Sequence, residues 1–208
     1  MGCALYLILA ALHAQALTLG AKGGVLIYQA SDTSEVGIVH VGRGPSTTNV
    51  RRYTLGPSIE IGLLFHFRIE ADALYRRFGR TESLFFNSAF GHINRLSGND
   101  WQFPLLLKFQ DSRGRLKPFV SAGAALRHIW GLQGSTESFF NRPIIPPTVS
   151  RYPVYAGKNI QAGLVFACGV RYQMGPIAVL PEIRYTRWTS ISLQPGRHQL
   201  EFLLGLAR

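Results

Sequence analysis

Apolar and polar residues alternate along about eight segments of this chain, each roughly ten residues long. A period of two places successive side chains on opposite faces of a β-strand, so each segment has one apolar and one polar face. The polar faces carry charged residues as well as neutral ones. The predicted strands are Leu17–Gln29, Tyr53–Phe65, Phe67–Phe78, Trp101–Phe109, Leu116–Trp130, Asn159–Gln173, Ile177–Trp188 and Arg197–Leu206.

The connections between these segments alternate between short and long. Short turns lie around His66, over Asp111–Gly114 and over Met174–Pro176. Longer connections include Gly79–Asn99 and the proline-containing stretch Gly131–Lys158, where proline argues against a central strand. Such alternation is typical of an outer-membrane barrel with both termini in the periplasm. The sequence therefore predicts an all-β, eight-stranded antiparallel up-and-down transmembrane β-barrel, with short periplasmic turns and long extracellular loops.

The N-terminus has the features of an export signal. An apolar stretch over Leu5–Leu12 is followed by Ala14-Gln15-Ala16, a small-x-small cleavage pattern. No Lys or Arg precedes Lys22, so the basic segment that usually opens a signal peptide is missing. We expect residues 1–16 to form a cleaved signal peptide and residues 17–208 to form the barrel domain, located in the cell outer membrane.

Charged residues recur on the polar faces, which would point into the barrel. An eight-stranded barrel has an interior just wide enough to be filled by side chains, and charges buried there must find partners. We expect an internal ion-pair network that closes the barrel; a polar lumen that conducts ions or holds a small ligand is the alternative. The predicted interior charges are Lys22, Glu60, Arg68, Glu70, Asp72, Arg76, Lys108, Arg127, Arg171, Glu182, Arg184 and Glu201.

The opposite faces carry Leu, Ile, Val, Phe and Ala, with aromatic rings near the strand ends. Rings at these positions fit the two interfacial girdles of a membrane barrel. In a soluble sandwich the apolar faces would instead form the core, which is a second interpretation. The predicted girdle residues are Tyr28, Tyr53, Tyr75, Trp101, Trp130, Tyr155, Tyr172, Tyr185 and Trp188.

The chain carries a formal net charge of +11, and much of the basic excess lies between the predicted strands. Extracellular loops of this sign would face anionic headgroups of the outer leaflet, so we expect contact with outer-membrane lipid and lipopolysaccharide, and no nucleic acid. Solubilising charge without a partner is the alternative. The basic loop residues are Arg43, Arg51, Arg52, Arg80, Arg95, Arg142, Arg151 and Lys158.

Sequence motifs for catalysis, metal binding or cofactor binding are not found in the chain. Two sets could supply the Ser/His/acid groups of a hydrolase that modifies lipid A: His92 with Ser88, and His128 with Ser135 and Glu137. Their spacing does not distinguish them from coincidence, and we predict no enzyme activity, cofactor or metal. Cys168 lies at an apolar position and is interpreted as a small hydrophobic residue.

Five stretches together resemble the small eight-stranded outer-membrane β-barrel proteins of Gram-negative bacteria, in the OmpA/OmpX-like and PorT-like groups. These stretches are Val25–Tyr28, Ile59–Leu63, Glu70–Arg77, Trp101–Lys108 and Lys117–Ala124. The resemblance spans the predicted mature chain and implies the fold, but says little about activity. Such proteins often end in an aromatic residue, whereas this sequence ends in Leu206-Ala207-Arg208.

Together these features predict a non-enzymatic, monomeric outer-membrane protein with a structural or surface-interaction role. Its basic loops would contact lipopolysaccharide, another surface polymer or a protein partner. Three other functions stay open at this point: a narrow porin-like channel, an enzyme that modifies lipid A, and a secreted lipocalin-like binder.

Overall fold

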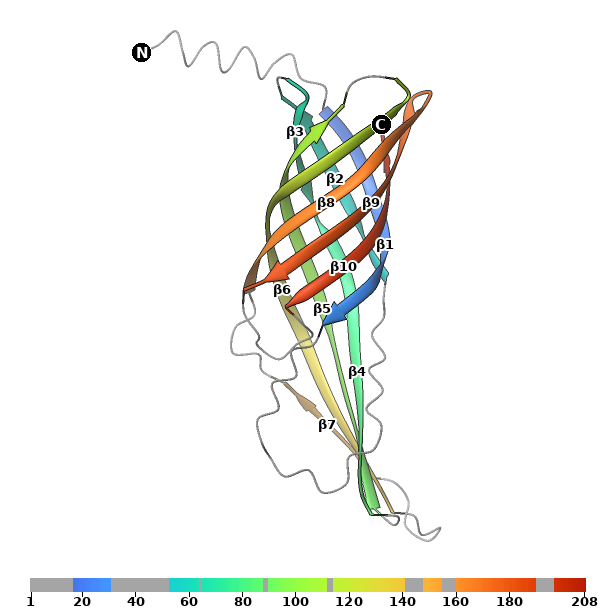
Figure 1. Cartoon of the computed structure of the whole chain (residues 1–208). Coiled ribbons are helices and arrows are strands. Elements are labelled where there is room, and N and C mark those ends of the chain that lie inside the picture. Colours follow the sequence, from blue (N-terminus) through green and yellow to red (C-terminus); the bar gives the residue numbers. More distant parts are fainter. Residues whose placement is uncertain are drawn as a thin grey trace, which may run out of the picture.

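The described part of the chain folds into ten β-strands, of which all but one contribute to a barrel wall (Figure 1). The computed structural model describes residues 17–30, 53–63, 65–87, 90–111, 114–140, 148–154, 160–189 and 197–208. The predicted signal peptide lies outside this range. The strands are β1 (Leu17–Ala30), β2 (Tyr53–Gly62), β3 (Phe67–Asp72), β4 (Leu74–Asn87), β5 (Phe90–Gln110), β6 (Leu116–Phe140), β7 (Thr148–Pro153), β8 (Ile160–Met174), β9 (Ile177–Trp188) and β10 (His198–Ala207).

The wall closes because the first and last strands pair with each other. β1 and β10 run antiparallel, with Gly20 opposite Ala207, and Leu19 and Arg208 exchange backbone hydrogen bonds of 3.0 and 2.8 Å. From β1 the wall continues through β2, the β3–β4 pair, β5, β6, β8 and β9 back to β10, with every pairing antiparallel. Since β3 and β4 share one position in the wall, the prediction of an eight-stranded antiparallel barrel is confirmed.

β3 and β4 are two halves of the single strand predicted over Phe67–Phe78. Both halves pair with β2 in one register, in which Ser58 faces Asp72 and Leu55 faces Tyr75. That register places Ala73 opposite Pro57, and the Ala73 N–H donates a 3.0 Å hydrogen bond to the Pro57 carbonyl. Proline has no N–H to return the bond, so the ladder is interrupted at Ala73 without changing the path of the strand.

Burial in the wall is opposite to that of a soluble barrel. In β8 the side chain of Leu164 is 54% exposed on the outside, whereas its neighbour Val165 is fully buried. The same alternation runs through β2, β5, β9 and β10, with apolar residues outside and mostly polar or small residues inside. Tyr53, Tyr172 and Trp130 are exposed on the outside, as predicted for girdle residues. Trp188 contradicts the girdle prediction: it is 2% exposed and points into the barrel, because Arg187 and not Trp188 has the outward register.

Both described chain ends and the short turns lie at one end of the barrel (Figure 1). The turn between β2 and β3 places Phe65 and His66 at positive φ, and Leu63 N donates to Phe67 O at 2.7 Å. The turn between β8 and β9 uses Gly175 at φ 61°. Among the described residues, no helix is long and apolar enough to cross a membrane.

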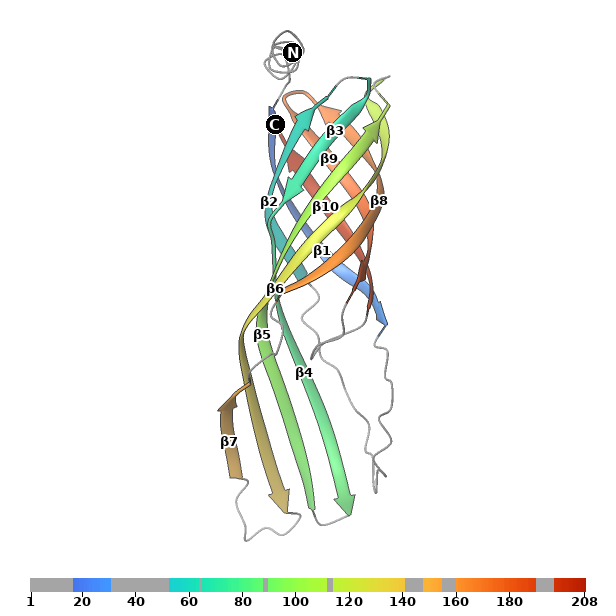
Figure 2. The ribbon, with the colours of Figure 1, turned by 90° about the vertical axis from the view of Figure 1, so that its left-hand side faces the viewer.

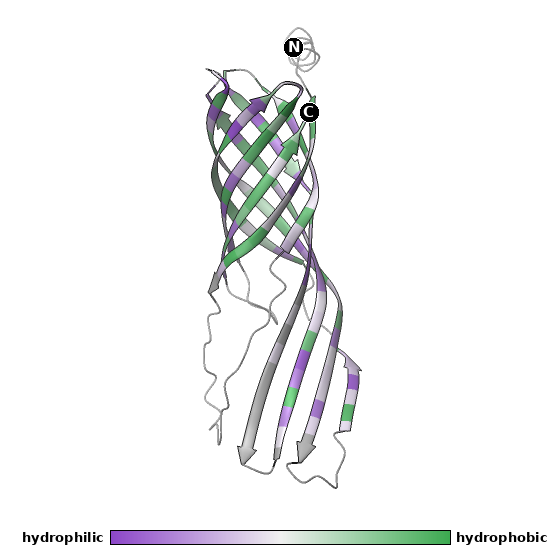
Figure 3. Ribbon diagram, turned by 90° about the vertical axis from the view of Figure 1, so that its right-hand side faces the viewer, coloured by the Kyte–Doolittle hydropathy of each residue, from purple (hydrophilic) through white to green (hydrophobic). Residues whose placement is uncertain are grey.

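At the opposite end, β4, β5 and β6 continue beyond the barrel and form, with β7, a projecting sheet (Figures 2 and 3), here called the extension. The outer parts of β4, β5 and β6 pair over residues 79–97 and 133–140, and β7 adds to β6 with Thr148 opposite Ser138. The prediction that Gly79–Asn99 and Gly131–Lys158 are loops is therefore wrong for most of both stretches. Polar residues on both faces gave these strands no apolar alternation, and Pro153 is tolerated because β7 is an edge strand.

Two glycines of the wall differ sharply in the space around them. A Cβ added to Gly56 would lie 1.8 Å from the Ala73 carbonyl oxygen, whereas the nearest atom to one on Gly23 would be Leu55 Cδ1, at an ordinary contact distance of 3.4 Å. We expect Gly56→Val to lower the free energy of unfolding by about 3 kcal/mol or to prevent folding, because the obstacle is backbone.

Gly23→Val is the matched control and should stay within about 1 kcal/mol of the parent chain, since valine suits an exposed strand position. Both are measured as unfolding midpoints in urea. Equal midpoints for the two variants would contradict the close approach of β2 and β4.

Candidate functional site

Charged side chains fill the barrel interior, and those nearest the chain ends form one connected group, here called the terminal layer. Lys22 on β1 donates to Glu70 on β3 and, at 2.7 Å, to Glu182 on β9. Arg184 donates to Glu182 at 2.7 Å and to Asp72 at 2.8 Å, and lies 3.1 Å from Glu70. These five side chains are buried, and their bonds join β1, β3 and β9 across the interior.

The terminal layer extends from Glu70 toward the mouth of the barrel. Lys108 on β5 donates to Glu70 and lies 3.4 Å from Glu60. Glu60 also accepts from Arg171 at 2.7 Å and lies 3.3 Å from Arg68, whose side chain is 23% exposed. The layer thus contains five cations and four carboxylates. The cation left over from one-to-one pairing is best assigned to Arg68, whose side chain is the most exposed to solvent.

A second group, the loop layer, surrounds Asp100 on β5 near the extension. Asp100 accepts from Arg127 at 2.9 and 2.7 Å, from Arg76 at 2.7 Å and from Gln102 at 3.2 Å. Arg76 also lies 3.7 Å from Glu201, which accepts a hydrogen bond from Thr54. The two arginines and two carboxylates balance, as buried charges require.

All twelve charged residues predicted for the interior have the inward register, but the sequence prediction missed the centre of the loop layer. Asp100 lies one residue before the predicted start of the strand at Trp101, so the predicted interior charges do not include it. Its register matches that of Gln102 and Lys108, so one further step of alternation along β5 would have identified it.

A layer of apolar side chains separates the two charged layers. Leu74 lies between Asp72 and Arg76 along the chain, and Leu106 lies between Gln102 and Lys108; both are 1% exposed. On the other strands the interior between the layers holds mainly small or apolar residues. The buried members of this apolar layer are Leu74, Leu106, Ala125, Val165, Trp188 and Leu203.

Glycines on facing strands allow the apolar layer to close. A Cβ on Gly24 would lie 2.5 Å from Leu203 Cδ2, and one on Gly163 would lie 2.7 Å from Trp188 Cε3. Leu203 and Trp188 therefore occupy the space that larger side chains would take. Among the described residues, no ion pair crosses this layer, so their interior charges fall into two separate ionic compartments.

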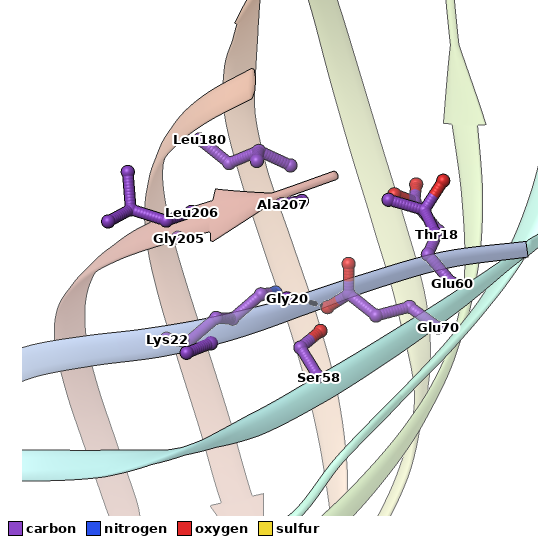
Figure 4. Close-up of a pocket in the computed structure, with 11 residues that line it drawn as sticks. Thr18, Gly20, Lys22, Ser58, Glu60, Glu70, Leu180, Gly205, Leu206 and Ala207 are labelled. Carbon is purple, nitrogen blue, oxygen red and sulfur yellow. Dashed lines mark hydrogen bonds and ion pairs between the residues drawn. The ribbon is translucent and has the colours of Figure 1, made fainter. Parts of the chain in front are cut away.

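A small pocket adjoins the terminal layer, between β1, β2, β9 and β10 (Figure 4). Lys22 and Glu70, joined by an ion pair, lie on one side of it, and Thr18, Ser58 and Leu180 help to line it. It offers about 10 Å³ to a water-sized molecule, which is about one water. This pocket is too small for an organic ligand.

Of the two catalytic sets considered from the sequence, the set of His128, Ser135 and Glu137 is not assembled. In the other set, Ser88 lies outside the described residues, and His92 Nδ1 lies 2.8 Å from the hydroxyl of Ser138. His128 and Ser135 are seven residues apart on β6, roughly 23 Å along a strand. Glu137 instead pairs with Arg95 at 3.0 Å. Within the described residues, no group of three or more His, Cys, Asp or Glu is arranged to hold a metal ion.

Among known proteins, only solved structures show similarity to this chain. No protein-family model matches the chain, and no curated protein sequence matches it. Neisserial surface protein A (NspA) is 14% identical, with 93% of this chain and 97% of that chain covered and a TM-score of 0.47. Ail, the attachment invasion locus protein of Yersinia pestis, solved with the heparin analogue sucrose octasulfate, is 8% identical, with 93% and 95% covered and a TM-score of 0.39. The fold class therefore rests on the strand pairing of this chain: a closed, eight-stranded antiparallel barrel with an apolar exterior and a charged interior.

The apolar layer predicts which interior charges depend on one another. Removing either partner of a buried pair should cost about 3–5 kcal/mol. In a double-mutant cycle, Asp100→Asn and Arg127→Gln should show a coupling energy of about 1–3 kcal/mol, because their side chains are in direct contact.

Asp100→Asn with Arg184→Gln is the control pair, since the apolar layer lies between the two residues. Its effects should add to within about 0.5 kcal/mol. The measurement is urea unfolding of the folded barrel, and coupling of similar size in both cycles would contradict the separation of the layers.

Proposed function

We propose that this chain is an integral outer-membrane β-barrel protein without enzyme activity, which holds the extension at the cell surface for interaction. The observation that supports it best is the exposed apolar wall. Leu, Ile, Val and Phe side chains such as Leu105, Leu164 and Ile183 are about half exposed on the outside. A continuous apolar exterior of this kind is unfavourable in water and favourable in lipid.

The dimensions of the wall fit a bilayer. In β5 the outward apolar run begins at Trp101 and ends at Phe109. Nine residues are about the number that a tilted membrane-spanning strand needs. Trp101 and Tyr75 make a tilted ring contact at one end of this run, with ring centroids 5.3 Å apart. Phe67 and Phe109 make a similar tilted contact at the other end, also at 5.3 Å. Aromatic pairs at both ends support an interfacial girdle on each side.

The end that carries the chain termini and short turns is assigned to the periplasm. Outer-membrane barrels have short periplasmic turns and longer extracellular connections. The extension then projects from the cell surface. Of the basic residues predicted there, Arg95 and Arg151 are exposed on the extension, while the side chains of the other six lie outside the described residues.

The filled interior argues for a surface role over a channel. The terminal layer and the loop layer leave the interior occupied by paired charges, and Leu106, Val165 and Leu203 close the space between them. The same packing leaves no room for the ligand of a lipocalin-like binder. We retain lipopolysaccharide and a surface polymer or protein as the proposed partners, with the barrel as a monomer.

Membrane insertion is tested by heat-modifiability. The folded barrel should run at a different apparent size on a gel before and after boiling, because the closed wall resists detergent until heated. The protein should also fractionate with the outer membrane. A soluble protein with no shift would overturn the proposal and make the apolar exterior a buried interface.

Planar-bilayer recording tests the closed interior. Correctly folded protein, verified by its gel shift, should show no discrete conductance steps, because ions would have to cross the dry layer around Leu106 and Leu203. Steps that persist at high salt would favour the narrow-channel alternative.

A further inference from the structure

Three neighbouring strands of the extension place Arg95, Ser135 and Arg151 in one cross-strand row. Arg95 on β5 lies opposite Ser135 on β6, which lies opposite Arg151 on β7. Directly opposite residues point to the same face, and neighbouring strands are about 4.8 Å apart, so the two arginine Cα atoms are roughly 10 Å apart. Two side chains of this length can converge above the serine between them.

The described residues of the extension do not fully neutralise the positive charge of this row. Arg95 pairs with Glu137 at 3.0 Å, yet its side chain remains 53% exposed. Arg151 is exposed, and no carboxylate of the described part of the chain pairs with it. Gln133, two residues before Ser135, adds an exposed amide on the same face. The row therefore combines two guanidinium groups with neutral hydrogen-bond donors.

The face that carries the row continues the lipid-facing wall. Along β5, Arg95 lies an even number of residues from the outward-facing Trp101 and Phe103, so its side chain points to the same face. The bulge near Ser97 does not change this alternation, because its extra residue is on β6. Arg95 lies six residues beyond Trp101, roughly 20 Å along the strand. The row thus stands above the aromatic girdle, at the level of the sugars on the membrane surface.

On the other face of the extension, several described polar side chains bond to one another. Thr136 donates to Asn94 Oδ1 at 2.9 Å and lies 3.3 Å from the Tyr152 hydroxyl, and His92 pairs with Ser138. The Tyr152 ring covers Gly134, where an added Cβ would lie 2.6 Å from it. Unengaged donors are therefore concentrated on the face that continues the membrane wall.

We infer that the row formed by Arg95, Ser135 and Arg151 binds a phosphate group carried by a sugar of the outer-leaflet glycolipid. Guanidinium groups donate paired hydrogen bonds to phosphate oxygens, and the serine hydroxyl and Gln133 amide can bind the third oxygen or the sugar. The glycolipid is favoured over a soluble polymer because the row faces along the membrane wall. This inference rests on the proposed function, which sets the membrane level.

The test uses folded protein in phosphatidylcholine nanodiscs, titrated by calorimetry with delipidated, phosphorylated core oligosaccharide of lipopolysaccharide. Arg95→Gln and Arg151→Gln should each weaken binding about tenfold, the effect of losing one charge-assisted contact. Glu137→Gln should tighten binding several-fold, since it releases Arg95. Arg115→Gln removes the same charge at the opposite end of the barrel and should have no effect.

The arginine variants should weaken oligosaccharide binding, whereas Glu137→Gln should tighten it. This difference separates recognition from stability, because a purely structural role of the Arg95–Glu137 pair would not raise the affinity when Glu137 is replaced. Unchanged binding in both arginine variants, equal binding of dephosphorylated oligosaccharide, or no gain from Glu137→Gln would overturn the inference. Equal binding of inorganic phosphate would also overturn it, as would preference for a sulfated oligosaccharide. The gel shift of each sample is scored separately, so failure of membrane insertion is distinguishable from failure of phosphate binding.

Discussion

Charge burial inside a closed wall is the constraint on which the rest of this structure depends. A carboxylate such as Glu70 is almost completely buried, so most of its partners must come from other strands. It finds them in Lys22 on β1, Lys108 on β5 and Arg184 on β9. A slip of one residue in any strand would turn its charges toward the outside. The ion pairs therefore fix the register as much as they occupy the space.

Much of the barrel could be predicted from the sequence because the alternation of apolar and polar residues shows which side chains face outward and which face inward. The inward register of residues such as Glu182 and Arg127 follows from period two alone. The pairing of these charges does not, since it depends on strands far apart in the chain. Trp188 was misplaced for a related reason: its size suggested an interfacial ring, while its parity and the space over Gly163 place it inside.

The extension was not predicted because most of its strand length does not face a hydrophobic core, so its sequence lacks the alternation of apolar and polar residues. Near the barrel, Ile129 and Leu132 pack with Leu96 and Val154 and anchor it. Beyond them, polar side chains occupy both faces, and their contacts are hydrogen bonds between strands, such as Thr136 with Asn94. Patterns of hydrophobicity carry no information about such pairings. The basic residues there looked like loop charge, and only the register reveals that two of them share a row.

The dry layer around Leu106 and Leu203 has a consequence for how such a chain could change over generations. Each ionic compartment must be balanced by its own members, so a lost charge on one side can be compensated only by a second change on that side. Related sequences should then show correlated substitutions within each compartment and independent ones between them. The loop-side half, with its extension, could be exchanged between barrels as a unit, while the half nearest the chain ends is inherited unchanged.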